Sequence, residues 1–386
     1  MSAFALTDEQ RAYVRQVREV AVQSLVPLAE QGVEGRVNRP LLEAMGSHGL
    51  LSRLFGPTGR SAAAMELCLL RETLATVCTD AETALALQAL GSYPFVLFGN
   101  EPVAERYREG VAAGTVVASF ALSEAEAGSD AAALGLRAEP EGEGWRLTGE
   151  KTWISNAPEA DVYTVFARTT ADARARGITA FVVAGNAPGL TGQALDMLAP
   201  HAIGRLTFDG VRVERADVLG EVDAGFKVAM RTLDVLRPSV GAFAVGMAQA
   251  ALDAAIEHTT SRQAFGGVLS DQQAVSHLLA EMATRVEASR LLVYAAAAAY
   301  DAGAAAELLT RKAAMAKLFA TESAQFVVDA AVQLHGARAL QRGHLLERLY
   351  RDVRAPRIYE GASEVQRTII GRSLTQAATS ERAEQA

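Results

Sequence analysis

The chain has 386 residues, half of them hydrophobic, which is enough for two or three domains with sizeable cores. Its 45 acidic and 37 basic side chains leave a net charge of −8, which argues against a general nucleic-acid binder. The same charge gives no support for docking on anionic membranes. The two cysteines, Cys68 and Cys78, cannot build a disulfide framework and are expected to be small buried residues.

The N-terminus carries acidic residues early and lacks a basic segment, so we expect no targeting signal. The longest charge-free stretch, Pro238–Leu252, is shorter than the roughly 18–20 residues that cross a membrane, and it contains Pro and Gly. We therefore expect a soluble, cytoplasmic protein with no membrane partner.

The first third of the chain has the residue spacing of helices. Thr7 followed by Gln10 predicts a capping box, and apolar residues then recur at helical spacing through Leu25. Further helices are expected at 41–50, 62–77, 81–90 and 103–111.

The pattern changes near Val116, where short segments rich in β-branched and aromatic residues predict strands of a sandwich or barrel. The expected strands include 145–148, 162–166, 178–183 and 206–208. Helical spacing returns after Asp223, followed by a frayed polar tail from Gln376. The expected helices are 226–236, 240–260, 272–302, 304–334 and 363–374. We predict a helical domain over 1–117, a β domain over 118–224 and a helical bundle over 225–386.

Two motifs in the β region have residue types that suit a flat ligand. Phe120–Asp130 runs from a strand into a Gly-Ser-Asp turn, whose small residues let a ligand approach backbone N–H groups. Lys151–Asn156 places a Trp beside hydroxyl groups, which suits packing and hydrogen bonding against an aromatic cofactor. Taken alone, each motif is more often an ordinary turn or a core Trp with a surface Ser.

A third motif, Arg262–Gly266 followed by Gln273, lies at a helix end. Its arginine can pair with phosphates, or it can be a solvated residue that is favourable near the helix C-terminus.

The fourth motif lies between 351 and 366. Pro356 interrupts a helix, and Ser363 with Gln366 predicts a capping box for the last helix, so Glu360 lies in a short loop. In an apolar pocket, burial would raise the pKa of Glu360 and suit it to act as a base. In solvent it would only be a loop acid stabilised by the helix dipole.

In their order and spacing, these motifs resemble the acyl-CoA dehydrogenase family of flavoproteins over 6–374. Five segments carry the resemblance: Ala121–Asp130, Trp153–Asn156, Arg262–Gln273, Gln333–Gly336 and Tyr359–Arg367. It implies a mostly α fold with a central β domain, non-covalently bound FAD and a homotetramer built as a dimer of dimers. It also implies oxidation of an acyl thioester, such as an acyl-CoA, to its trans-2-enoyl form, with an electron-transfer flavoprotein as acceptor.

The resemblance assigns roles to matching positions. Glu360 would be the base that removes the α-proton, and its own backbone N–H would stabilise the enolate. A second family pattern places the base on an earlier helix, where this chain has Leu236, which supports Glu360 as the base. The cofactor-binding positions would be Phe120, Leu122, Ser123, Trp153, Ser155, Arg262, Phe265, Gln273, Gln333 and Gly336. The substrate-binding positions would be Ser129, Tyr359 and Gly361. Those that reach the FAD of a neighbouring subunit would be Arg262, Phe265, Gln333 and Gly336. No metal site is expected.

Several positions depart from the family pattern. Alanines at Ala337 and Ala339 replace glycines, Ala362 replaces a threonine, and the loops at 55–61 and 199–204 differ. These departures suggest a specialised relative that acts on an acyl-carrier-protein thioester or on a short branched or cyclic acyl group. The rival hypothesis is a non-catalytic scaffold without flavin, and a third is a flavin oxidase or monooxygenase.

Overall fold

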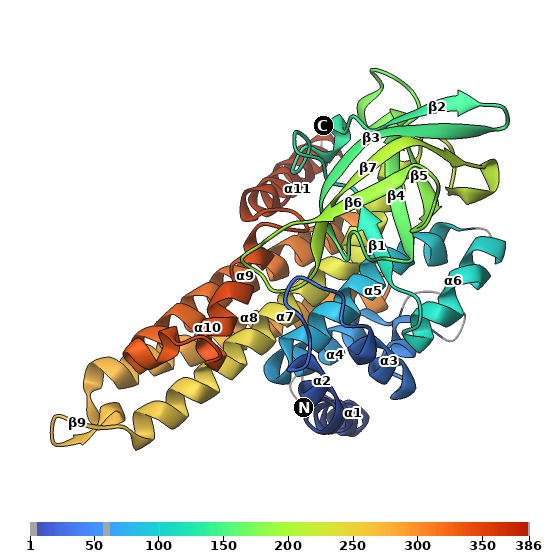
Figure 1. Ribbon diagram of the computed structural model, residues 1–386. Coiled ribbons are helices and arrows are strands. Elements are labelled where there is room, and N and C mark those ends of the chain that lie inside the picture. Colours follow the sequence, from blue (N-terminus) through green and yellow to red (C-terminus); the bar gives the residue numbers. More distant parts are fainter. Residues whose placement is uncertain (1–5, 57–61, 100, 385–386) are drawn as a thin grey trace. The chain divides into compact units, whose positions relative to one another are not determined.

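The computed structural model describes residues 6–56, 62–99 and 101–384 (Figure 1). Its contacts divide the chain into two units. The helical unit comprises Met1–Glu19, Ala63–Thr79 and Asp234–Ala386, and the sheet unit comprises Val20–Ala62 and Asp80–Leu233. The predicted architecture, mostly α with a central β region, is confirmed. The predicted boundaries near 117 and 224 remain predictions.

Three long helices form the core of the helical unit: α7 (Gly225–Ser261), which belongs to this unit from Asp234 onward, α8 (Gln273–Asp301) and α9 (Ala306–His335). They run side by side in Figure 1 and share a core rich in alanine. A Cβ at Gly241 would lie 2.7 Å from the Val293 side chain, so the small residue permits this close approach. The unit's other α-helices are α1 (Asp8–Val20), α4 (Ala64–Val77), α10 (Leu345–Asp352) and α11 (Ser363–Glu384). Shorter elements are β9 (Gln263–Ala264), β10 (Gly267–Val268), η6 (Leu269–Asp271), η7 (Gly336–Leu340) and η8 (Ala355–Arg357).

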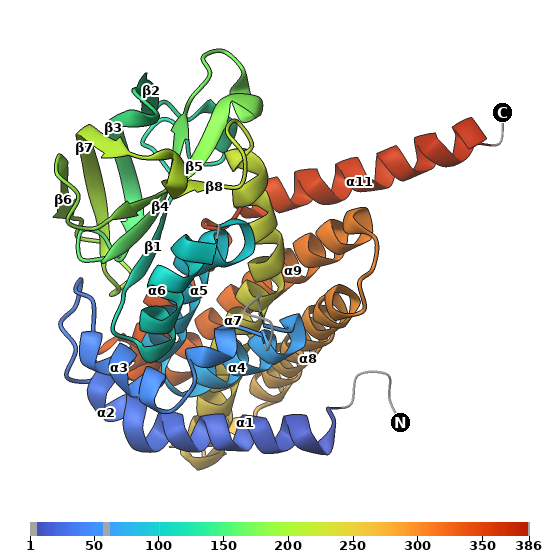
Figure 2. The same cartoon turned by 90° about the vertical axis from the view of Figure 1, so that its right-hand side faces the viewer.

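The capping box predicted at the start of α1 is confirmed. The Thr7 N–H donates to Gln10 Oε1 at 3.0 Å, and the Gln10 N–H donates to Thr7 Oγ1 at 3.1 Å. The frayed tail is wrong, because α11 continues to Glu384 and extends away from α9 in Figure 2.

The break predicted between 236 and 240 is also wrong, because α7 passes through Pro238 without interruption. Both flanks of the proline are buried, and this packing outweighs the hydrogen bond that proline removes. α7 is also long and apolar enough to cross a membrane by composition, but 78% of its apolar window is buried inside the protein. Core packing therefore accounts for its composition.

The sheet unit contains one eight-stranded sheet, in the order β6-β7-β3-β2-β4-β5-β8, with β1 added parallel to β4. The four strands predicted from composition lie within β3, β4, β5 and β7. The strands are β1 (Ala118–Ala121), β2 (Arg137–Glu141), β3 (Gly144–Ser155), β4 (Val162–Arg168), β5 (Ile178–Ala184), β6 (Leu190–Ala194), β7 (Ile203–Val213) and β8 (Val218–Leu219).

Helices cover the β1 and β4 region of this sheet. α5 packs on β1 and β4 through a core that includes Phe95, Ala118 and Phe166. At Gly91 the helix comes so close that a Cβ would lie 2.4 Å from the Ser119 nitrogen. The unit's helices are η1 (Ala21–Leu25), α2 (Val26–Ala29), α3 (Arg39–Ser47), η2 (Ser52–Leu54), α5 (Thr79–Phe98), α6 (Glu101–Ala113), η3 (Ala131–Ala133), η4 (Arg174–Gly177) and η5 (Arg215–Asp217).

Candidate functional site

The sheet unit brings the predicted cofactor-wall motifs together. The segment that leaves β1 runs beside the end of β3, where the Thr152 N–H donates to the Ser123 carbonyl at 3.0 Å. Ser119 Oγ donates to the Ser155 carbonyl at 2.6 Å, one strand position before Phe120. Residues about 30 positions apart in the sequence therefore form one local surface. Its predicted members are Phe120, Leu122, Ser123, Trp153 and Ser155.

Trp153 is the most exposed aromatic residue of this surface. Its side chain is 48% exposed, and its backbone has φ of +56°, a conformation that bulky residues rarely adopt. Ser155 Oγ lies 3.5 Å from His201 Nε2, and burial lowers the pKa of His201 to about 4, so this imidazole is neutral near pH 7. Five residues after Ser123 in the same loop, a Cβ at Gly128 would meet no atom within 4 Å. An exposed ring beside a hydroxyl and open backbone fits a flat aromatic cofactor.

A buried ion pair holds this surface, and sequence reasoning missed it. The Lys151 side chain is fully buried, and its Nζ donates to the Leu122 carbonyl at 2.9 Å and to Glu124 Oε1 at 2.7 Å. The Glu124 carboxylate also accepts the N–H groups of Gly135 and Leu136 at 2.6 and 3.0 Å. Lys151 therefore fixes the loop after β1 against β3.

In the helical unit, Glu360 lies in the loop between η8 and α11, with φ of +49°, followed by Gly361 with φ of +90°. Its Oε2 atom is buried and has no hydrogen-bond partner among the described residues. Burial raises the pKa of Glu360 above its usual value, and the cations of Arg71, Lys317 and Arg237 oppose that rise. The site therefore combines an available carboxylate oxygen with nearby positive charge.

These cations are themselves buried and held. Arg71 Nη1 donates to Ser239 Oγ at 2.7 Å, and Arg237 pairs with Asp234. Lys317 Nζ donates to backbone carbonyls of the Glu360 loop. Sequence reasoning assigned a role to none of the three cations, because a basic residue in a helix is usually exposed.

The capping box predicted from Ser363 and Gln366 is wrong. Ser363 Oγ donates to Glu322 Oε1 at 2.5 Å, and Gln366 Nε2 donates to the Gly361 carbonyl at 2.9 Å. Both side chains therefore secure the Glu360 loop rather than capping each other. Tyr359 and Gly361, the predicted substrate-binding positions of this loop, flank Glu360.

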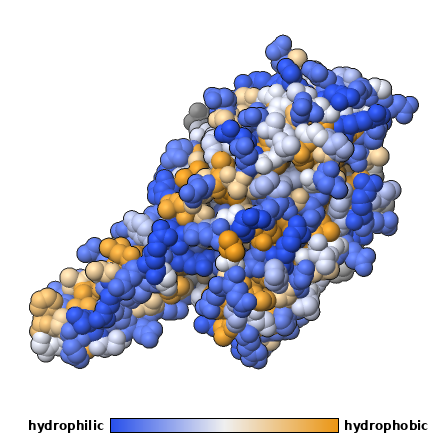
Figure 3. All heavy atoms as spheres, in the orientation of Figure 1, coloured by the Kyte–Doolittle hydropathy of each residue, from blue (hydrophilic) through white to orange (hydrophobic). Residues whose placement is uncertain are grey.

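The remaining predicted cofactor positions lie in the helical unit. Arg262 follows α7, and Phe265 forms the turn of the short β9–β10 hairpin, where its side chain is 90% exposed. Figure 3 shows apolar side chains in the region where Figure 1 places β9. Gln273 begins α8 and is exposed, as is Gln333 near the end of α9.

Gly336 ends α9 with φ of +65°, and a Cβ there would meet nothing within 4 Å. Ala339, one of the departures from the family pattern, is fully buried in the core of the helical unit. Ala337 is exposed. Ser129 of the sheet unit is exposed beside the Asp130–Arg174 ion pair. In the predicted loop 55–61, residues 57–61 lie outside the described residues.

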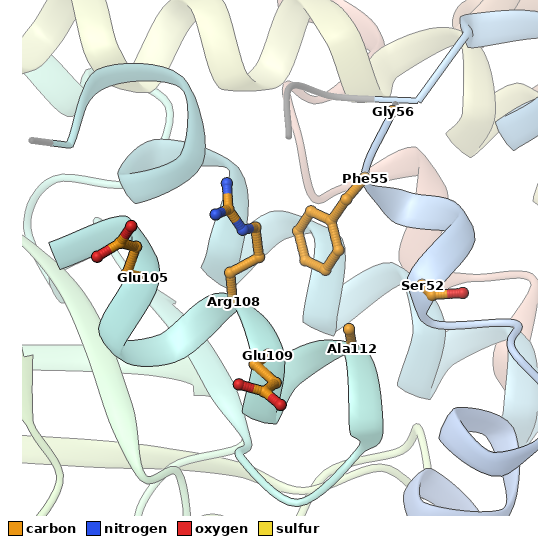
Figure 4. A pocket seen from close by; sticks show the side chains of 7 residues that line it. All are labelled: Ser52, Phe55, Gly56, Glu105, Arg108, Glu109 and Ala112. Atoms are coloured by element: carbon orange, nitrogen blue, oxygen red, sulfur yellow. The ribbon is translucent and has the colours of Figure 1, made fainter. Parts of the chain in front are cut away.

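Figure 4 shows a pocket of about 520 Å³ in the sheet unit, between η2 and α6. None of the sequence-predicted site residues lines it. Its lining residues are Ser52, Phe55, Gly56, Glu105, Arg108, Glu109 and Ala112.

Comparisons with known proteins identify the family. Models of the N-terminal, middle and C-terminal domains of acyl-CoA dehydrogenases match residues 7–115, 119–211 and 223–375. A protein of Mycobacterium tuberculosis named "Probable acyl-CoA dehydrogenase FadE25" is 37% identical over 379 residues, covering 96% of each chain.

Two solved structures are similar over nearly the whole chain. Butyryl-CoA dehydrogenase from Megasphaera elsdenii has a TM-score of 0.89 at 32% identity, over 96% of this chain and 99% of that one. The FAD complex of PigA has a TM-score of 0.89 at 25% identity, with the same two coverages. The chain therefore belongs to the acyl-CoA dehydrogenase family of FAD-dependent oxidoreductases.

Proposed function

We propose that this protein catalyses the α,β-dehydrogenation of an acyl thioester, with Glu360 as the catalytic base. The observation that carries the proposal is the Glu360 carboxylate, whose Oε2 atom is buried, lacks a partner among the described residues and belongs to a strained loop. Strain of this kind is costly and concentrates at functional sites. If this buried carboxylate had only a structural role, both of its oxygens would be expected to accept hydrogen bonds.

The chemistry requires a base because a hydrogen next to a thioester carbonyl is only weakly acidic. Glu360 takes this α-proton, and the raised pKa that burial gives its carboxyl makes the carboxylate a stronger base than one in water. The Glu360 backbone N–H is the proposed donor to the enolate oxygen. Bound FAD supplies a two-electron acceptor for the β-hydride, so the proton, the hydride and the new C=C bond balance.

The cofactor assignments follow from the same family membership. Trp153 and Ser155, with Phe120, Leu122 and Ser123, would contact the flavin, while Ser129 would lie near the thioester tail. Arg262, Phe265, Gln333 and Gly336 would reach the FAD of a neighbouring subunit in a homotetramer, and Gln273 would also bind the cofactor. An electron-transfer flavoprotein as acceptor and a cytoplasmic location are part of the same proposal.

The test is an anaerobic titration of the FAD-loaded protein with a panel of acyl-CoAs, monitored at the flavin absorbance band. Bleaching by one member supports the proposal and identifies the acyl class. Retained FAD without bleaching by any member contradicts acyl-CoA as the substrate and favours a carrier-protein thioester. Failure to bind FAD favours the scaffold hypothesis.

Glu360→Gln tests the base directly. This variant should keep its yellow colour, and its flavin should be reduced about 10²–10⁴-fold more slowly, which is the contribution expected of a general base. Glu307→Gln, which removes an exposed acid of α9, is the control and should react at the wild-type rate. Because burial raises the Glu360 pKa, the wild-type rate should fall with acidification at a pH above the ordinary glutamate pKa of 4.5. A Glu360→Gln variant that is reduced at the wild-type rate would refute the assignment.

A further inference from the structure

A buried lysine of α9 donates hydrogen bonds to the loop that carries Glu360. Lys317 is fully buried, and its Nζ donates to the Gly361 carbonyl at 2.7 Å and to the Tyr359 carbonyl at 3.2 Å. These two carbonyls belong to the residues on either side of Glu360. One ammonium group therefore binds the backbone both before and after the proposed base.

The loop needs such a restraint because its backbone is strained. Glu360 has φ of +49°, which costs free energy for any residue other than glycine, and Gly361 follows with φ of +90°. Gln366 Nε2 provides a second donor to the Gly361 carbonyl, at 2.9 Å. Without these donors, the two carbonyls would lose partners and the loop could relax to a conformation that aims the carboxylate elsewhere.

Burying an ammonium group costs free energy of desolvation, so a buried lysine at position 317 needs a physical explanation. Desolvation lowers the pKa of Lys317 to about 8, and the carboxylate of Glu360 opposes that shift. The charged groups that act on Lys317 are Glu360, Arg237, Glu322 and Glu364. A neutral apolar side chain of similar length would fill the same space in α9 at lower cost.

We propose that Lys317 is a positioning residue for the dehydrogenation, which fixes the Glu360 carboxylate by binding the carbonyls of Tyr359 and Gly361 and, together with Arg71 and Arg237, opposes its protonation. The inference rests on the proposed function of Glu360. It assigns two separable effects to Lys317: one on the geometry of the loop and one on the protonation of the base.

Three variants separate these effects. Lys317→Met removes both the hydrogen bonds and the charge. Gln366→Met removes a donor to the same Gly361 carbonyl and leaves the charge in place. Lys312→Met removes a half-buried lysine five residues earlier in α9, and it is the matched control.

The first measurement is hydrogen–deuterium exchange of FAD-loaded protein, which needs no substrate. Peptides covering 358–364 should exchange faster in Lys317→Met and Gln366→Met than in wild type, while the remainder of α9 keeps its protection. Lys312→Met should match wild type. If Lys317→Met does not fold, Lys317→Gln, which also removes the ammonium group, takes its place in both measurements.

The second measurement is the pH dependence of flavin reduction by an acyl-CoA that bleaches the wild type. The flavin of Lys317→Met should be reduced about 10- to 100-fold more slowly than that of wild type, as expected for a misplaced base. The acidic limb of its pH–rate profile should shift to higher pH, because loss of the cation raises the pKa of Glu360. In Gln366→Met, flavin reduction should also be slower, but the acidic limb of the profile should stay where it is in wild type.

Wild-type exchange in 358–364 for Lys317→Met and Gln366→Met would overturn the positioning role, whether or not a substrate has been found. A slower Lys317→Met enzyme with an unshifted acid limb would overturn the electrostatic part. If no acyl-CoA bleaches the wild type, the proposed substrate is wrong, and the exchange experiment still decides the positioning role.

Discussion

Strained backbone marks several of the predicted site residues. Trp153, Phe265 and Glu360 all have positive φ, at +56°, +57° and +49°. Each was identified in the sequence from its motif, but the motif says nothing about its backbone. Because such conformations persist only when the surroundings impose them, the groups that restrain these residues are themselves functional candidates.

Lys151 is such a restraint in the sheet unit, and Lys151→Met should destabilise the protein strongly. The substitution leaves the Glu124 carboxylate without its cation partner, although two backbone N–H groups still donate to it. Removing one partner of a buried pair costs about 3–5 kcal/mol in the free energy of unfolding. Urea unfolding of the FAD-loaded protein measures this loss.

The control for Lys151 is Arg137→Met, which breaks the exposed pair of Arg137 with Glu139 in the same unit. Exposed pairs contribute little, so the midpoint of this variant should stay near that of wild type. Equal midpoints for Lys151→Met and Arg137→Met would show that the buried pair does not stabilise the sheet unit.

Sequence reasoning located the motifs but not the residues that hold them. Glu360 and Trp153 could be predicted because their neighbours form recognisable patterns. Lys151 and Lys317 could not, because lysine is nearly always exposed and the partners of these two are 27 to 44 residues away. A partnership of this kind is a property of the folded chain and leaves no local pattern.

At the scale of elements, the long helices were predictable because apolar residues recur along them. The error at Pro238 shows the limit of this approach, because a proline predicts a break that burial on both sides of it can override. The strands β2, β6 and β8 escaped prediction for a different reason. β2 and β6 are largely exposed and β8 has two residues, so none shows a clear alternation of apolar and polar positions.

The contact between α5 and β1 sets the position of Phe120, and Gly91→Ala should disturb it. The added Cβ would lie 2.4 Å from the Ser119 nitrogen, so the helix or the strand must move. Overpacking of this kind costs about 1–3 kcal/mol. Thermal unfolding should show the loss, and weaker FAD retention should show that β1 has moved.

Gly371→Ala in α11 is the matched substitution. It also places alanine in a helix, but its Cβ meets no atom within 4 Å, so it should stabilise α11 by about 0.5–1 kcal/mol through helix propensity. If Gly91→Ala is as stable as Gly371→Ala, the close approach of α5 to β1 does not constrain the sheet unit.

At the scale of the whole molecule, the β9–β10 hairpin is where the proposed contact with a second copy of the chain, which would complete the cofactor site, can be tested. Phe265 and Gly266 form its two-residue turn, and both have positive φ, as such turns require. Asparagine is the favoured residue at the first of these positions. Phenylalanine there combines a backbone conformation that is costly for a bulky residue with a side chain that is 90% exposed.

Phe265→Asn should therefore separate folding from assembly. Asn-Gly is a better turn for the hairpin, so the variant should unfold at the same temperature as wild type or higher once each is compared without FAD. Light scattering should show a smaller mass than the expected homotetramer, and FAD should be lost more readily on dilution. Val33→Asn, which changes an exposed valine of the sheet unit, should retain both mass and FAD. A Phe265→Asn variant that keeps the wild-type mass and FAD affinity would mean that the ring lies outside the subunit contact and outside the cofactor site.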